Sequence, residues 1–190
     1  MSDENTAEAA PSTGGDPSAL RADLNAEYLA IVKLVSEFDG RLMIVKGWSV
    51  TLSLAGLGLA FQQAHYALFI LASATAVAFW SIETAMKRHQ MQYYPRMRAI
   101  EVATSNLNAV LIDGHLVSAP LIDWFWGFRG KGNFRPDMPT QRDAANVRRM
   151  IRLAPFMSHV MLPHVIAAVL GLVLFILGVL KVSGFENMVP

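Results

Sequence analysis

The chain has 190 residues, of which 53% are hydrophobic and 16% are charged. Soluble domains carry about 25% charged residues, so this composition, with a mean hydropathy of +0.34, argues against an ordinary soluble protein. Because the chain has no cysteine, disulfide frameworks and thiolate nucleophiles are excluded, and its length excludes a large multidomain enzyme.

The chain begins with an acidic segment of small and polar residues, and we expect residues 1–18 to form a disordered tail. A heptad pattern over residues 19–46 then predicts an amphipathic helix. Its apolar seam consists of Leu24, Tyr28, Ile31, Val35, Phe38 and Leu42. Two interpretations remain open: a coiled coil with a second copy, or packing against the middle of the same chain.

No Asp, Glu, Lys or Arg occurs from Gly47 to Ile82, and a polar cluster around Gln62 divides this stretch. Each half has roughly 18 residues and would extend about 27 Å as a helix, close to the thickness of a bilayer's hydrocarbon core. We therefore predict a transmembrane hairpin over residues 44–86, with spans at 44–62 and 66–86. A third span is predicted at 160–181, inside a second uncharged stretch.

Small residues predict where the spans contact other helices, either of this chain or of another subunit; the candidates are Gly56, Ala60 and Gly171. Glu83 is the only carboxylate within a predicted span. We expect it to pair with Lys87, one helical turn away, and a role in a pore or proton path is the alternative.

Basic residues set the predicted orientation. Residues 87–159 hold 11 basic and 5 acidic side chains, a net charge of +6, whereas residues 1–46 hold 4 basic and 8 acidic, a net charge of −4. The turn between the first two spans has no basic residue. The positive-inside rule therefore predicts a cytoplasmic N-terminus and middle segment, and a short outward-facing tail at 182–190.

Within the middle segment, residues 96–112 are predicted to form a helix with Ile100, Ala103 and Leu107 on one face, which Asp113-Gly114 ends. Residues 116–128 are apolar but too short to span. We expect them either to form a re-entrant or interfacial segment or to close a small cytoplasmic domain. The conformation of residues 113–139 is not predicted. The candidate contacts to anions, headgroups or a partner are Arg129, Lys131, Arg135, Arg148, Arg149 and Arg152. Alternatively, these basic residues bind no specific partner, and their excess only reflects the position of the segment beside the anionic inner leaflet.

We predict no catalytic, cofactor or metal site and no specific nucleic-acid binding. None of the five histidines belongs to an HExxH motif, and Lys131 is followed by Gly132 instead of the Ser or Thr of a Walker loop. His115, Ser118 and Asp123 have the residue types of a hydrolytic triad. However, no nucleophile elbow surrounds Ser118.

The stretch from Glu37-Phe38-Asp39-Gly40-Arg41 to Tyr93-Tyr94-Pro95-Arg96-Met97-Arg98-Ala99-Ile100-Glu101 resembles uncharacterised small multi-span inner-membrane proteins of Gram-negative bacteria. A hairpin with cytoplasmic helices is also similar in architecture to small membrane effectors of bacterial stress or phage-defence systems. The resemblance implies a bacterial origin but no assigned function.

Together these patterns predict an all-α membrane protein with three transmembrane helices, a hairpin plus a C-terminal span, and cytoplasmic helical extensions. We expect a non-enzymatic protein in the lipid bilayer that forms a homo-oligomer or joins another membrane subunit, with a cytoplasmic module for a partner or signal. A channel-like effector is one specific version. The alternatives are an accessory subunit of a larger membrane or transport complex and, with less support, a membrane-bound enzyme.

Overall fold

The computed structural model describes residues 16–108, 110–117, 120–128 and 142–190. Most of the predicted acidic tail, together with the candidate contact residues Arg129, Lys131 and Arg135, lies outside the described residues. The last three tail residues belong to the start of the first helix. There, Asp16 accepts a hydrogen bond from the backbone N–H of Ser18 at 2.9 Å, and Pro17 is the first helical residue.

The first helix, α1 (Pro17–Gln63), has 47 residues and extends about 70 Å. The predicted boundary at residue 46 between a cytoplasmic helix and a span therefore corresponds to no break in the backbone. The helix ends where Ala64 adopts a left-handed conformation, with φ of 53°, and its N–H bonds back to Phe61 O at 3.2 Å.

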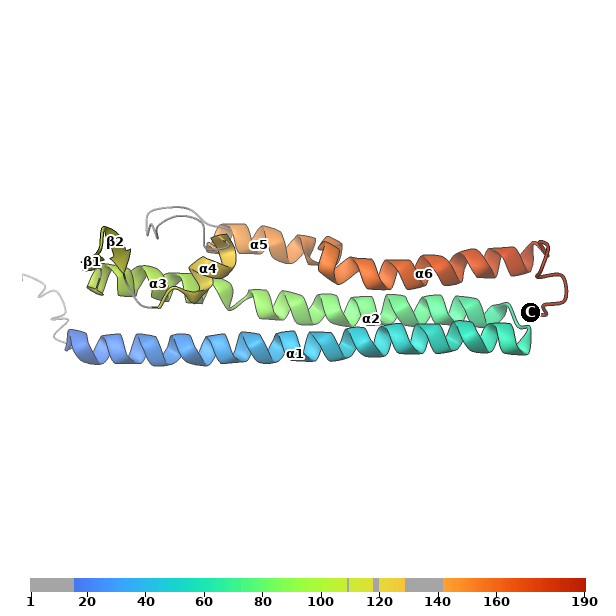
Figure 1. The fold of residues 1–190 in the computed structure, drawn as a ribbon, viewed down its shortest axis with the longest axis horizontal. Coiled ribbons are helices and arrows are strands. Elements are labelled where there is room, and N and C mark those ends of the chain that lie inside the picture. The colour runs from blue at the N-terminus through green and yellow to red at the C-terminus, as the bar shows by residue number, and fades with distance from the viewer. Residues whose placement is uncertain (1–15, 109, 118–119, 129–141) are drawn as a thin grey trace, which may run out of the picture.

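In the part of the chain that the structure describes, three helices are long and apolar enough to cross a membrane. The second half of α1 runs antiparallel to α2 (Ala67–Met91), and α6 (Ser158–Val179) packs on α2, so that α2 lies in the middle (Figure 1). Large apolar side chains on the outside of these helices are exposed, among them Leu54, Leu71 and Ile166. Such a surface suits contact with lipid tails, and the chain has the features of a membrane protein with three spans.

At one end of the bundle, shorter helices surround the first half of α1 and the end of α2: one packs along α1, and the others pack mainly on that helix or on α2. They are α3 (Tyr94–Asn108), α4 (Ile122–Phe128), α5 (Ala144–Leu153) and the 3-10 helix η1 (Ala154–Phe156), which leads into α6. We call residues 17–46 together with these elements the cap. Its core contains Tyr28, Val35, Met97, Ile100 and Val147.

The predicted heptad seam is buried inside this cap. Tyr28, Val35 and Leu42 are at most 5% exposed, and Ile31 is 9% exposed. Leu24 packs on the same core and Phe38 contacts His89 and Tyr93. The structure therefore agrees with the second interpretation, in which the seam packs against the middle of the same chain. The hypothesis of a coiled-coil assembly seam is wrong for this face of α1, because α2 and α3 of the same chain already cover it.

Two predictions for the middle segment are wrong. The helix ends at Asn108, and a β-hairpin of β1 (Val110–Ile112) and β2 (His115–Val117) follows, so the fold is not purely α-helical. Asp113 and Gly114 have φ of 50° and 78°, the positive values that a two-residue hairpin turn requires. The buried face of α3 is also rotated: Glu101, Thr104 and Ser105 are buried, while Leu107 is 40% exposed.

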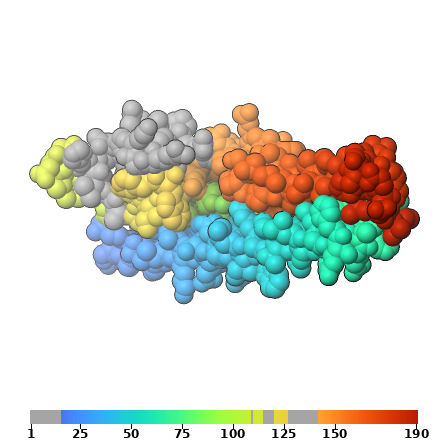
Figure 2. Space-filling view, turned by 45° about the vertical axis from the view of Figure 1, so that its right-hand side comes forward, coloured from blue at the N-terminus to red at the C-terminus, as the bar shows by residue number. Residues whose placement is uncertain are grey.

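At the opposite end, residues 180–190 fold back over the turn between α1 and α2 (Figures 1 and 2). Val189 donates to Ala64 O at 2.8 Å and accepts from Tyr66 N at 3.0 Å. Met188 is buried beside Leu57, Ala60, Phe69 and Ala72. The predicted outward-facing tail is thus packed against the end of the bundle, which we call the turn end.

The three small residues predicted as span contacts all face helices of the same chain. An added Cβ at Gly56 would lie 3.1 Å from Ala72 Cβ, and one at Gly171 would lie 2.8 Å from Phe69 O. Ala60 is completely buried. These residues therefore allow α1 and α6 to approach α2 closely, so the expected contacts to another subunit are not needed to explain them.

Candidate functional site

A buried polar cluster joins all three spans near the cap. Glu83 of α2 lies 2.8 Å from His164 Nε2 of α6 and forms an ion pair with Lys46 of α1 at 3.1 Å. Ser49 Oγ of α1 lies 2.8 Å from the other ring nitrogen, His164 Nδ1. Ser49, Glu83 and His164 are each at most 1% exposed. We call these four residues the span cluster.

Both ring nitrogens of His164 are engaged, Nδ1 with the Ser49 hydroxyl and Nε2 with the Glu83 carboxylate. Lys46 places a positive charge beside the same carboxylate. The predicted pair of Glu83 with Lys87 is wrong, because Lys87 is paired with Asp39 at 3.7 Å. A nearby cation and a hydrogen-bonded ring are the physically favourable surroundings for a carboxylate buried between apolar helices.

The residue types of the span cluster match those of a Ser–His–acid hydrolase, but its geometry does not offer hydrolysis. A catalytic serine must be reached by substrate, whereas Ser49 is 1% exposed and lies between α1 and α6. A hydrolase triad has the same order of contacts, but its serine faces an open substrate site. Here all three groups are sealed by helix packing. The cluster is suited to joining the spans, not to acyl transfer.

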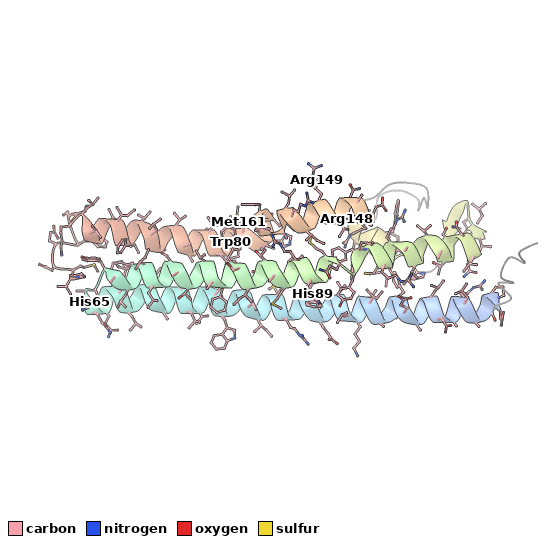
Figure 3. The ribbon with its side chains drawn as sticks, turned by 180° about the vertical axis from the view of Figure 1, so that it is seen from behind. His65, Trp80, His89, Arg148, Arg149 and Met161 are labelled. Atoms are coloured by element: carbon pink, nitrogen blue, oxygen red, sulfur yellow. The ribbon has the colours of Figure 1, made fainter. Side chains whose placement is uncertain are left out.

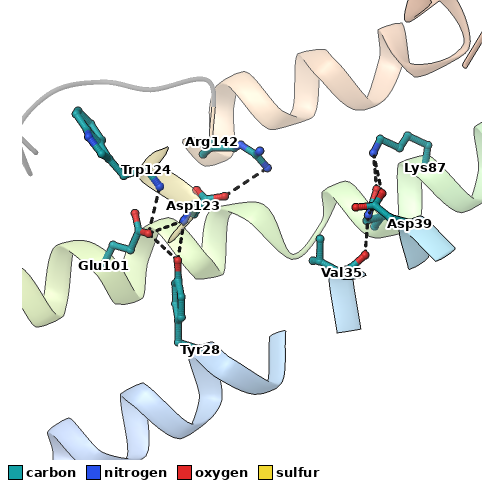
Figure 4. A network of polar contacts seen from close by, with 9 residues as sticks. Tyr28, Val35, Asp39, Lys87, Glu101, Asp123, Trp124 and Arg142 are labelled. Atoms are coloured by element: carbon teal, nitrogen blue, oxygen red, sulfur yellow. Dashed lines mark hydrogen bonds and ion pairs between the residues drawn. The ribbon is translucent and has the colours of Figure 1, made fainter. Parts of the chain in front are cut away.

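A second polar group lies where the spans meet the cap (Figure 4). The Gln90 side-chain amide donates to Val35 O at 3.0 Å and to Asp39 Oδ1 at 2.8 Å, and it accepts from Lys87 Nζ at 2.6 Å. Gln90 is completely buried. It therefore connects α2 to the middle of α1 at the level where the apolar segment ends.

The third group, inside the cap, is centred on Glu101 of α3 (Figure 4). Its Oε1 atom accepts from Tyr28 Oη at 2.6 Å, from Asp123 N at 2.8 Å and from Trp124 N at 3.2 Å. The Tyr28 hydroxyl in turn accepts from Asp123 N at 2.7 Å. Glu101 thus binds the first turn of α4, whose backbone N–H groups have no partner within that helix, and holds α4 against α1.

Burial raises the pKa of Glu101 to about 7, although the Tyr28 hydroxyl and the two backbone N–H groups oppose this shift. Burial also raises the pKa of Asp123 to about 6, against the nearby charges of Arg142 and Arg98. Arg142 lies 3.4 Å from Asp123, and its guanidinium carbon lies 3.6 Å from the Tyr94 ring centre. The cap interior therefore holds two carboxyl groups that titrate close to neutral pH.

The described basic residues among the predicted contacts lie on α5. Arg148, Arg149 and Arg152 are exposed, and Arg149 points away from the bundle (Figure 3). On the inner face of the same helix, Val147 is 2% exposed and packs into the cap core. The structure thus presents these three arginines together on a helix that the cap and the third span hold in place.

Several features of these sites carried no signal in the sequence. Ser49, Glu83 and His164 lie on three different helices and match no motif, and Tyr28 and Glu101 are 73 residues apart. Glu83, a carboxylate inside a predicted span, was the one member of these sites that the sequence marked as unusual. The triad hypothesis of His115, Ser118 and Asp123 finds no support at Asp123, which is fully buried and paired with Arg142; Ser118 lies outside the described residues.

Among the described residues, no group of three or more His, Cys, Asp or Glu side chains is arranged to hold a metal ion. Comparisons of the chain with protein-family models, with curated proteins and with solved structures found no match. Function must therefore be inferred from the geometry of this chain.

Proposed function

We propose that this chain is a non-enzymatic inner-membrane scaffold, which holds the cap at the cytoplasmic membrane face and presents the α5 arginines to an anionic partner. One observation carries the proposal: the helices run from the spans into the cap without flexible connections. α1 is continuous over 47 residues, and η1 joins α5 directly to α6. The cap is therefore held at a fixed position and orientation relative to the membrane.

The polar groups support binding over catalysis. The most reactive side chains of the described residues, in the span cluster and around Glu101, are buried and engaged with one another. The α5 arginines are instead exposed, and three cations on one short helix favour a partner with carboxylates or phosphates. A single chain also fills the space between its spans with side chains such as Leu57, Phe69 and Ala72. A channel-like effector would therefore need a pore formed between copies.

The test is native mass spectrometry of the protein purified from its own host, comparing wild type with R148Q/R149Q/R152Q. We expect a second chain at fixed ratio with the wild-type protein and its loss from the variant. The matched control is R21Q/K33Q/R41Q, which removes three exposed positive charges from α1 in the cap and leaves α5 intact. This control should retain the partner.

The outcomes separate the alternatives. A partner that survives R148Q/R149Q/R152Q contradicts docking on α5 and favours an accessory subunit held through its spans. A homo-oligomer that contains no other polypeptide contradicts the proposal that the chain is a scaffold for another protein. In that case conductance measurements in planar bilayers would follow, and unchanged permeability would remove the channel version.

A further inference from the structure

A groove follows the outer boundary between α2 and α6. It consists of two hollows, of about 530 Å³ and about 330 Å³. The larger is lined by apolar residues that include Ala74, Ala78 and Leu172, and the smaller includes Trp80 and Arg88. Val77 lines both hollows, so they adjoin. The volume of the larger hollow is within the range of small-molecule sites, about 300–1,000 Å³.

The groove changes from apolar to cationic along its length. At its cap end, Arg88 Nε donates to Ile151 O at 3.2 Å. In the described part of the chain, no hydrogen bond is formed by the two terminal nitrogen atoms of Arg88, which is exposed. Ile151 precedes the exposed Arg152 of α5. The cap end of the groove therefore presents the two terminal nitrogens of the Arg88 guanidinium beside the basic helix α5.

The length of the groove fits one leaflet of a bilayer. Ala74 and Arg88 are 14 residues apart on the same face of α2, which is about 21 Å along the helix. Half of a hydrocarbon core is about 15 Å, and the headgroup zone adds about 5–7 Å. Trp80, whose indole N–H donates to Pro155 O at 3.0 Å, lies between these ends at the boundary of α2 and η1 (Figure 3).

We propose that this groove binds one anionic phospholipid, with an acyl chain along Ala74 and Ala78 and the phosphate at Arg88. The charge of the groove argues for a lipid over a second copy of the chain. An apolar helix laid into it would leave Arg88 without a counter-charge, whereas a phospholipid supplies hydrocarbon and an anion at the right separation. Arg88 confers the preference for anionic headgroups, and the small side chains on α2 make room for the acyl chain.

The experiment offers the detergent-purified full chain an equimolar mixture of phosphatidylglycerol and phosphatidylcholine with identical acyl chains. Native mass spectrometry then counts the lipids that remain bound. We expect one retained phosphatidylglycerol per chain. Because one basic residue near an anionic surface contributes about 1 kcal/mol, R88Q should lower the preference over phosphatidylcholine about fivefold. A78L should reduce the retention of both lipids by filling the groove.

Two controls separate the groove from the general surface. R41Q removes an exposed charge from α1, and A55L enlarges an exposed alanine of α1 that lines neither hollow. Both should behave as wild type. Equal retention of the two lipids by the wild-type protein, or variants indistinguishable from their controls, would overturn the proposal. So would an oligomer that holds no lipid and dissociates in A78L, because a second copy would then occupy the groove.

Discussion

Glu83 and Glu101, two of the buried carboxylates among the described residues, are stabilised in different ways. Glu83 lies between the spans with a cation, Lys46, on one oxygen and His164 on the other. Glu101 lies in the cap, where its Oε1 accepts hydrogen bonds from one hydroxyl and two backbone N–H groups. Its Oε2 has no hydrogen-bond partner among the described residues. Glu83 therefore links Lys46 and His164 on two other helices, whereas Glu101 has a raised pKa and titrates near neutral pH.

Removing the Glu83 carboxylate should destabilise the spans strongly. Glu83→Ala leaves Lys46 and His164 without their partner, and breaking one side of a buried pair costs about 3–5 kcal/mol. Ser49→Ala removes one neutral hydrogen bond from the same cluster and should cost about 1 kcal/mol. The free energy of unfolding in mixed micelles measures both. Equal losses for the two variants would show that Glu83 does not act as the ionic centre.

The cap should lose stability as pH rises towards neutral because of Glu101. Its pKa is raised from 4.5 to about 7 in the folded chain, so the folded state binds more protons than the unfolded state between these values. The contribution of Glu101 is therefore fully present below about pH 4.5 and is lost as pH rises through 7. The slope is at most about 1.4 kcal/mol per pH unit. Unfolding of wild type and Glu101→Gln, followed by α-helical circular dichroism from pH 4 to 8, measures the difference.

Glu37→Gln is the matched control for this titration, since Glu37 is an exposed carboxylate of α1 in the cap. Its difference from wild type should stay small at every pH. The interpretation of Glu101 fails if the wild-type minus Glu101→Gln difference is constant between pH 4.5 and 7. Asp123, whose pKa is also raised, should leave part of the wild-type pH dependence in the Glu101→Gln protein.

At the scale of elements, the close contact between α2 and α6 depends on the absence of a side chain at Gly171. A Cβ there would lie 2.8 Å from Phe69 O and 3.3 Å from Ser73 N, which are backbone atoms that cannot rotate away. Ser73 also donates to Ala168 O at 2.9 Å, a bond between the two helices. A larger residue at position 171 must therefore separate α6 from α2.

Gly171→Ala should lower the free energy of unfolding by about 1–3 kcal/mol, the usual cost of overpacking. Gly58→Ala is the control on α1, because an added Cβ there meets nothing within 4 Å. This change should be neutral or stabilising by up to about 1 kcal/mol, since alanine is the better helix former. Thermal unfolding in detergent compares the two variants. Similar melting temperatures would mean that the helices can adjust at no cost.

The sequence predicts the elements well where one physical effect dominates. The length of the uncharged stretches locates the three described helices that are long and apolar enough to cross a membrane, because a bilayer leaves little freedom in length or conformation. The sequence predicted that Ile100, Ala103 and Leu107 share one face of α3, but only Ile100 is fully buried and Leu107 is 40% exposed. Hydrogen bonds of Glu101 to α1 and α4 instead turn a polar face inwards. Prediction also failed at Asp113-Gly114, because this dipeptide ends helices as well as forming hairpin turns.

At the scale of the whole molecule, α1 joins the two ends of the protein. Its first half carries Tyr28 and its second half carries Lys46 and Ser49, so one rigid element contacts both the cap network and the span cluster. Neither site could be predicted from local sequence, because each is assembled from helices far apart in the chain. Glu83 and His164, for example, are 81 residues apart. Only the packing of α6 on α2 brings them together.

The basic residues of the cap predict that α1 crosses the membrane with its first half in the cytoplasm. The chain has no cysteine, so single introduced cysteines report position without background. Ser36→Cys and Gln63→Cys change exposed residues of the same helix, 27 positions and therefore about 40 Å apart. In spheroplasts, a membrane-impermeant maleimide should label Gln63→Cys at once and Ser36→Cys only after permeabilisation. Labelling of Ser36→Cys from outside would invert the orientation, and equal labelling of both would show that α1 does not cross the bilayer.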